Sequence, residues 1–286
     1  MNEKMADLLQ IEKTIIEIGL KREYKFFQIS DMHMSYVDSE SSLIDREELK
    51  RYHKQWDTLK RDFAKQFNEV CDERYDIEPN IIFEALCGYA LKQKADALIL
   101  SGDIMDRVTE SNLRYMRKFV STYPIPVIYC LGNHGAMNER GEKLNQYHRF
   151  EGIIDNPEID TFDFEEIKIV TFDNGGAGIT DNQLNKLTAT LCENKPTLIV
   201  VHKPLNLGEF GEKMCKELSP YFLMGVKGDS ENTYKALETI KSSSKNIIGV
   251  FAGHIHGAKQ YKIFGNTYQY TASSGLIGAG REIIIK

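Results

Sequence analysis

Five short polar motifs, spaced along the chain in a fixed order, constrain this sequence most. Each comes at or near the end of an apolar stretch, and together they hold five of the seven histidines. The motifs are Asp31-Met32-His33, Gly102-Asp103-Ile104-Met105-Asp106, Gly132-Asn133-His134, His202 within Val-Val-His-Lys-Pro, and Gly253-His254-Ile255-His256. Strands that end in such side chains bring them together at one edge of an α/β sheet. The order of the motifs therefore favours an α/β fold with a single site at its strand ends.

The side chains in these motifs are of the types that hold divalent metal ions. Asp, Asn and His are hard to borderline ligands, and no cysteine stands among them. One residue separates Asp31 from His33 and His254 from His256, and in extended chain such residues project to the same side, about 6.6 Å apart. Two ions roughly 3.5–4 Å apart are within reach of such pairs. A lone histidine is more often structural than a ligand, but five motifs in order predict a two-metal hydrolytic centre.

Apolar periodicity predicts strands and helices that alternate along most of the chain. Apolar runs predict strands at 26–30, 97–100, 126–131, 160–173 (a pair turning near 165–166), 197–201 and 247–251, with a meander of strands from 260 to 286. Spacing by threes and fours predicts helices at 5–19, 45–75, 80–93, 110–122, 180–193 and 229–243. Thr180 and Gln183 have the spacing of a capping box. We expect the glycines before Asp103, Asn133 and His254 to let the backbone turn sharply.

The chain length of 286 residues fits one large domain, 1–286, with a helical insertion. The interval from Asp31 to Asp103 is longer than a single β-α-β crossover needs, and its surplus at about 38–78 is helical in pattern. The apolar stripe of that insertion includes Trp56 and must bury against something. Packing on the following helix, a cap over the cleft and a contact between two copies of the chain are the alternatives.

The composition limits which binding partners and which cellular compartment we expect for this protein. The net charge of −6 gives no basic footprint for nucleic-acid binding. The five cysteines are scattered and form no C-x-x-C pair, which favours a reduced, cytoplasmic protein with free thiols. The first residues lack the apolar region of a signal peptide, and no stretch approaches the ~20 apolar residues that span a bilayer. We therefore expect a small-molecule substrate, with neither a membrane nor a nucleic acid as partner.

Taken together, the five motifs resemble the pattern D-x-H, G-D-x-x-D, G-N-H, H and G-H-x-H of the calcineurin-like metallophosphoesterase superfamily. The resemblance covers residues 26–257 and implies a four-layer α-β-β-α sandwich with a dimetal site at its strand ends. It implies that Asp103 bridges the two ions. The remaining implied ligands are Asp31, His33 and His256 for the first ion and Asn133, His202 and His254 for the second.

The resemblance also implies a mechanism for phosphoester hydrolysis. A hydroxide that bridges the ions attacks phosphorus in line with the leaving oxygen, and His134, which is not a ligand, protonates that oxygen. Asp106 is expected to hold the His134 imidazole. Arg107 either reaches a substrate phosphate or forms an ion pair at a helix start. Manganese is the ion we expect, with iron, zinc, nickel or cobalt as alternatives for such a nitrogen and oxygen ligand set.

Departures from subfamily patterns leave the substrate open. Val108 follows Asp106-Arg107 where phosphoprotein phosphatases have glycine, and purple acid phosphatases have Tyr in place of Asp106. Gly135 follows His134 where small bacterial phosphodiesterases have Asp. Those phosphodiesterases are still the nearest likeness, so we expect a cyclic nucleotide or a similar small diester as substrate. A phosphomonoesterase or Ser/Thr protein phosphatase is the alternative, and a non-catalytic binding scaffold is the alternative from another class.

Overall fold

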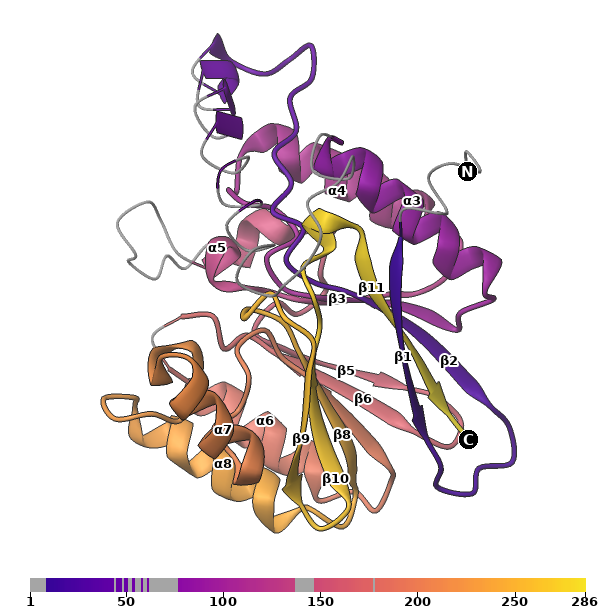
Figure 1. Ribbon diagram of the computed structural model, residues 1–286, viewed down its shortest axis with the longest axis vertical. Helices are drawn as coiled ribbons and strands as arrows, with labels where there is room; N and C mark the ends of the chain where they lie inside the picture. The colour runs from indigo at the N-terminus through magenta and orange to yellow at the C-terminus, as the bar shows by residue number, and fades with distance from the viewer. Residues whose placement is uncertain are drawn as a thin grey trace.

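The computed structural model describes residues 9–43, 45–47, 49–50, 53–54, 58, 61, 77–136, 147–176 and 178–286. Two β-sheets lie face to face, with helices α3 and α4 covering the outer face of one and α6, α7 and α8 that of the other (Figure 1). This arrangement confirms the expected four-layer α-β-β-α sandwich. Among the described residues, no helix is both long enough and apolar enough to cross a membrane.

The first sheet has the strand order β1-β11-β2-β3-β4 and the second the order β5-β6-β7-β8-β10-β9. The strands β2, β3 and β4 run parallel to one another, as do β6, β7 and β8. The strands are β1 (Gln10–Ile16), β2 (Tyr24–Ile29), β3 (Ala97–Ser101), β4 (Val127–Cys130), β5 (Ile159–Asp163), β6 (Lys168–Phe172), β7 (Thr197–Val200), β8 (Ile247–Ala252), β9 (Lys259–Phe264), β10 (Thr267–Thr271) and β11 (Ala279–Ile285). Parallel neighbours of this kind end at the same edge of their sheet.

Three apolar clusters hold the four layers together. One lies between the sheets and includes Phe26, Ile99, Leu198 and Phe251. The other two fill the spaces between each sheet and its helices. Strands with both faces covered read as continuous apolar runs rather than as alternating patterns, which is why β3 and β7 were recognisable from sequence.

Four of the predicted helices coincide with α3, α4, α6 and α8, and two observed helices were not foreseen: the four-residue α5 and the longer α7. In α7, Phe210 and Met214, four residues apart, bury one face. That spacing indicates a helix in the sequence, but the two glycines in the first turn of α7 weaken the helix prediction. The helices are α3 (Pro79–Lys92), α4 (Glu110–Thr122), α5 (Asn133–Ala136), α6 (Asp181–Leu191), α7 (Gly208–Glu217) and α8 (Glu231–Ser242).

The helix predicted at 5–19 is wrong, because residues 10–16 form β1. This strand pairs in parallel with β11, at the other end of the chain. Arg281 on β11 donates to Glu12, to the Thr14 hydroxyl at 2.8 Å and to the carbonyl of Thr271 at 2.9 Å. Pairing with a distant strand thus overrode a local spacing that resembled a helix, in a segment rich in β-branched residues.

The meander predicted from 260 to 286 is correct only in its first part. β9 and β10 form a hairpin that turns at Gly265-Asn266, as expected. β11 then leaves that sheet and inserts between β1 and β2 of the other sheet. The chain therefore ties the two sheets together at its end rather than extending one of them.

The insertion at about 38–78 is described only in part. Within it the structure describes helical residues at 43, 45–47, 49–50, 53–54, 58 and 61. Trp56 and most of the predicted stripe lie outside the described residues, so a role as a cap or as a contact between chains stays a prediction. At the start of the insertion, Asp38 forms a two-pronged ion pair with Arg114 on α4 at 2.7–2.9 Å.

The capping box of α6 is present and gives a prediction for stability. The Thr180 hydroxyl accepts from the Gln183 backbone N–H at 3.1 Å, and the Gln183 side chain accepts from the Thr180 N–H at 2.9 Å. We expect Thr180→Ala to lower the free energy of unfolding by about 0.5–2 kcal/mol, because it leaves a helix N–H without its acceptor. Thr188→Ala, on the exposed face of the same helix, is the control and should change it little. Equal losses in urea unfolding of the two variants would argue against the capping contribution.

Candidate metal centre

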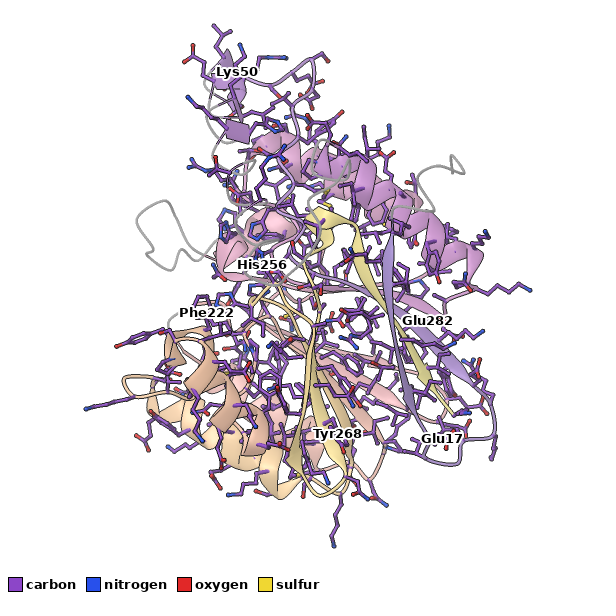
Figure 2. The ribbon with its side chains drawn as sticks, in the orientation of Figure 1. Glu17, Lys50, Phe222, His256, Tyr268 and Glu282 are labelled. Carbon is purple, nitrogen blue, oxygen red and sulfur yellow. The ribbon has the colours of Figure 1, made fainter. Side chains whose placement is uncertain are left out.

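The predicted site residues come together where strands of both sheets end. They follow β2 and β3 and β4 in the first sheet, and β7 and β8 in the second. His256 marks the place in Figure 2, between the two sheets at one end of the sandwich. The seven predicted ligands fall into two groups, which we call the first ligand group (Asp31, His33 and His256) and the second ligand group (Asp103, Asn133, His202 and His254).

The first ligand group is almost entirely buried. His256 Nε2 lies 3.3 Å from Asp31 Oδ1 and 3.2 Å from His33 Nε2. Asp31 is fully buried, and His33 is only 2% exposed. Burial raises the pKa of Asp31, but the positive charge of His256 and His202 more than offsets it, so the pKa of Asp31 is low and the carboxylate is ionised. A carboxylate and two imidazoles thus face one another at ligand distances.

The second ligand group crowds around one nitrogen atom. His202 Nδ1 lies 3.0 Å from the carbonyl oxygen of Ser101, which only accepts, so Nδ1 carries the hydrogen and Nε2 presents a lone pair. That Nε2 lies 3.0 Å from Asp103 Oδ2, 3.0 Å from Asn133 Oδ1 and 3.2 Å from His254 Nδ1. The two groups adjoin, because the same Nε2 is 4.0 Å from Asp31 Oδ1.

While His202 is neutral, its Nε2 and the oxygens of Asp103 and Asn133 are all acceptors held close together, which favours a positive charge among them. Burial disfavours a charged His202, but Asp103 and Asp31 outweigh it and raise the pKa of His202. Burial, and then the charge on His202, lower the pKa of His254 to about 3. The group therefore draws in one proton by itself. A divalent ion fits the same donors, which are the nitrogen and oxygen ligands that such ions take in hydrolases.

The backbone at the ligands is held in an uncommon conformation. Positive φ angles occur at Asp31 (53°), His33 (45°), Asp103 (50°), His254 (70°) and His256 (54°). In the described part of the chain only one other non-glycine residue, Lys94, shares this left-handed region. Such conformations cost of order 1–3 kcal/mol each and cluster at functional sites. The extended-chain geometry expected for the D-x-H and H-x-H pairs is therefore wrong, and the chain curls so that His254 and His256 serve different ligand groups.

The glycines in the motifs serve close approach more than sharp turning. Of the three before Asp103, Asn133 and His254, only Gly102 has a positive φ, of 98°. A Cβ atom on Gly132 would lie 2.0 Å from Asp103 Oδ1 and 2.4 Å from the Asp103 backbone nitrogen. Only hydrogen fits there, so the segments that leave β3 and β4 can bring their ligands together.

Gly132→Ala is therefore expected to disturb the second ligand group. The added methyl must push against the Asp103 backbone, which costs about 1–3 kcal/mol of unfolding free energy and displaces the carboxylate. We expect metal affinity measured by competition with a chelating dye to fall at least about tenfold. Gly135→Ala is the matched control, because its Cβ would meet only side-chain atoms, of Leu131 at 3.3 Å and Phe150 at 3.6 Å, and no backbone. Unchanged metal affinity in Gly132→Ala would contradict this account of the loop.

His134 stands beside the metal-ligand groups and is anchored by Asp106. Its Nδ1 lies 2.9 Å from Asp106 Oδ1 and 3.0 Å from the Asp106 carbonyl oxygen. Its side chain is 33% exposed, whereas that of Asp106 is 4% exposed. Burial opposes the charged imidazole, but Asp103 and Asp106 raise the pKa of His134 to about 10. With Nδ1 directed at Asp106, Nε2 is the atom that would meet a substrate.

Asp106 contacts two imidazoles at once. Its Oδ1 also lies 3.1 Å from His33 Nδ1 in the first ligand group. Burial raises the pKa of Asp106, but hydrogen bonds from His134 and His33 bring it down to about 2. The neighbouring Arg107 guanidinium is 4.0 Å from Asp106 Oδ2 and about one third exposed. This contact corresponds to the ion pair that was one of the two alternatives for Arg107. A contact between Arg107 and a substrate phosphate stays a prediction.

The sequence-based prediction missed Asn174, which supports the site from behind. Its Oδ1 accepts from the N–H groups of His202 at 3.1 Å and Lys203 at 2.9 Å, and its Nδ2 donates to the Lys203 carbonyl at 2.7 Å. These bonds fix the backbone that carries a ligand. The available signal was Asp173-Asn174, a polar pair directly after the buried strand β6, as in the five motifs.

Comparison with known proteins agrees with the geometry. No curated protein sequence matches the chain. Among solved structures it resembles a dimetal phosphatase from Danio rerio, with 12% identity, a TM-score of 0.52 and 88% of each chain covered. It also resembles a purple acid phosphatase from yellow lupin (Lupinus luteus) seeds, with 10% identity, a TM-score of 0.52, and 91% of this chain but 45% of that one covered. Identities this low indicate a shared fold.

A comparison with models of protein families identifies the family as well as the fold. Residues 24–258 match the model of the calcineurin-like phosphoesterases, over most of the chain and across all five motifs. That family uses a dinuclear divalent metal centre, and the two ligand groups supply candidate residues for it. The chain belongs to the calcineurin-like phosphoesterase family and is a metal-dependent phosphoric ester hydrolase.

Proposed function

We propose that this protein hydrolyses a small phosphodiester, such as a cyclic nucleotide, at a dinuclear metal centre held by the two ligand groups. The observation that carries the proposal is the approach of Asp103 Oδ2, Asn133 Oδ1 and His254 Nδ1 to within 3.0–3.2 Å of His202 Nε2, a set of nitrogen and oxygen donors that suits a divalent cation. Asp31, His33 and His256 form the adjoining group for a second ion. Asp103 is proposed to bridge the two.

Charge favours an anionic phosphoester at this place despite the acidic chain. Two divalent ions bring four positive charges, and the buried carboxylates of Asp31 and Asp103 offset two of them. Such ions, when bound, supply hydroxide near neutral pH and stabilise charge that develops on phosphoryl oxygens. The site then stays positive in a setting where burial strengthens its field.

The residues of the chain itself are proposed to handle the leaving group. His134 is proposed to enter the reaction with a proton on Nε2, because the Asp106 carboxylate 2.9 Å from its Nδ1 stabilises the charged imidazole and raises its pKa. A protonated Nε2 would stabilise the leaving oxygen and donate to it as the bond to phosphorus breaks. Asp106 fixes the imidazole through Nδ1 and stabilises its charge.

An exposed aromatic side chain beside the second ligand group supports a diester. Phe222 is 41% exposed, and its ring centroid lies 5.4 Å from that of His254 (Figure 2). One ester arm would leave at His134, and the arm that stays on phosphorus would pack against the Phe222 ring. A monoester has no second arm to make this contact.

Two chromogenic substrates test the proposal. The protein loaded with Mn²⁺ is expected to hydrolyse bis(p-nitrophenyl) phosphate faster than p-nitrophenyl phosphate, and removal of metal with EDTA should stop both reactions until Mn²⁺ is restored. A preference for the monoester would overturn the diester assignment in favour of a phosphomonoesterase or protein phosphatase. Metal binding without hydrolysis of either ester would indicate a binding scaffold and overturn the proposed activity.

A further inference from the structure

The chain between β10 and β11 crosses from the second sheet to the first (Figure 1). We call residues 272–278 the crossing segment. It contains a short 3-10 helix (Gly275–Ile277), and Ser274 comes directly before this helix. The proposed reaction uses no residue of the crossing segment, although the segment contacts the backbone of a residue in the first ligand group.

Ser274 and the two residues after it hold the backbone of Asp31. The Ser274 hydroxyl donates to the Asp31 carbonyl oxygen at 2.7 Å, and the Leu276 N–H donates to the same oxygen at 3.3 Å. The Gly275 N–H donates to the carbonyl of Ser30 at 2.7 Å. Asp31 and Ser274 are both buried, so water is not at hand to replace these bonds.

Asp31 depends on this support because its backbone conformation is unfavourable by itself. Its φ of 53° lies in the left-handed region, where Cβ crowds the following carbonyl oxygen. Without the Ser274 hydroxyl, that buried carbonyl would keep only the longer bond from Leu276. We then expect the backbone to relax and the carboxylate to shift from His256 Nε2, which lies 3.3 Å from Asp31 Oδ1.

The crossing segment fits closely against the chain around Asp31. A Cβ atom on Gly275 would lie 2.4 Å from Met32 Sδ and 3.0 Å from the Ser30 carbonyl oxygen. Leu276 is only 1% exposed. Atoms packed this closely have little freedom to move and restore a lost bond. The geometry of Asp31 should therefore be sensitive to the single hydroxyl of Ser274.

We propose that Ser274 is a positioning residue that sets the metal affinity of the first ligand group through the backbone of Asp31. This inference rests on the proposed function, because it assigns the residue to one of the two ions of that centre. The hydroxyl would contact neither ion nor substrate. Side chains that orient a metal ligand in this indirect way typically change metal affinity by 10–100-fold.

The effect should fall mainly on the first ion. Asp31 Oδ1 lies 4.0 Å from His202 Nε2, whereas the other members of the second ligand group lie 3.0–3.2 Å from that atom. The Asp31 carboxylate also accepts from the His254 backbone N–H at 3.0 Å. A shift of Asp31 would thus move a direct ligand of the first ion but only a backbone contact of the second.

Two variants that each keep one ligand group intact give the test. Asn133→Ala removes a ligand of the second group, and His33→Ala removes a ligand of the first. Mn²⁺ binding is measured by equilibrium dialysis, and the unaltered protein should bind two ions. Adding Ser274→Ala to Asn133→Ala is expected to weaken binding of the remaining ion about 10–100-fold. Adding it to His33→Ala should leave the affinity nearly unchanged, and Ser274→Ala alone should weaken one ion of the two.

Ser230→Ala is the matched control for the loss of a buried or partly buried serine cap. The Ser230 hydroxyl accepts from the Thr233 N–H at the start of α8, as that of Ser274 accepts from the Leu276 N–H. Ser230→Ala should keep both Mn²⁺ affinities. Unchanged affinities in Ser274→Ala, or equal losses at both ions, would overturn this inference and leave the dinuclear centre intact. Fewer than two ions on the unaltered protein would overturn the proposed centre and this inference with it.

Discussion

Asp103→Asn is expected to lose both metal ions and to reduce phosphoester hydrolysis by about 10³-fold or more. The Asp103 Oδ1 accepts from the His134 N–H at 2.9 Å, while Oδ2 lies 3.0 Å from His202 Nε2. A carboxamide has only one oxygen, so one of these positions would receive an NH₂ group. The substitution also removes a charge that the proposed bridging role requires between the two ions.

Metal content measured by inductively coupled plasma mass spectrometry checks this prediction. Asp96→Asn is the matched control, because Asp96 precedes β3 at the end opposite Asp103 and bonds to Arg22 and the Lys25 N–H. That variant should keep two ions and near-normal turnover. Two tightly held ions in Asp103→Asn would rule out the bridging role.

His134→Asn is expected to keep both ions and to lower kcat by roughly 10²–10⁴-fold. The His134 imidazole belongs to neither ligand group. The His134 backbone N–H donates to Asp103, and the variant retains this bond. The substitution removes the imidazole proton that Asp106 stabilises in the unaltered protein. The decrease should be smaller for esters with a good leaving group such as p-nitrophenolate, because that oxygen needs less protonation.

His148→Asn serves as the control for a histidine in the same part of the chain. His148 is exposed on a short 3-10 helix (Tyr147–Phe150). It should leave kcat within about twofold, as surface substitutions usually do. Near-full activity of His134→Asn, measured with the same metal content, would show that the leaving group is handled by another residue.

The part of the site that could be predicted from sequence is the part specified locally. A ligand such as His202 follows an uninterrupted apolar strand, and parallel strands must end at the same edge, so β2, β3, β7 and β8 bring their motifs together. The types of side chain then limited the chemistry. The sandwich itself followed from the resemblance that those motifs carry, and the fold confirms it.

The part that could not be predicted depends on contacts between distant residues. β1 pairs with β11 across nearly the whole chain, and no local pattern at Gln10–Ile16 reveals that partner. The left-handed backbone at Asp31 and His254 is costly by itself and exists because surrounding strands impose it. Asn174 likewise gains its role only from neighbours brought close by folding.

Anomalous diffraction from crystals of the Mn²⁺-loaded protein would show directly whether the centre is dinuclear. Two peaks per chain about 3.5–4 Å apart are expected. One should lie among Asp31, His33 and His256, the other among Asn133, His202 and His254, with Asp103 in contact with both. A single peak, or two peaks that Asp103 does not join, would contradict the dinuclear centre on which the proposed reaction depends.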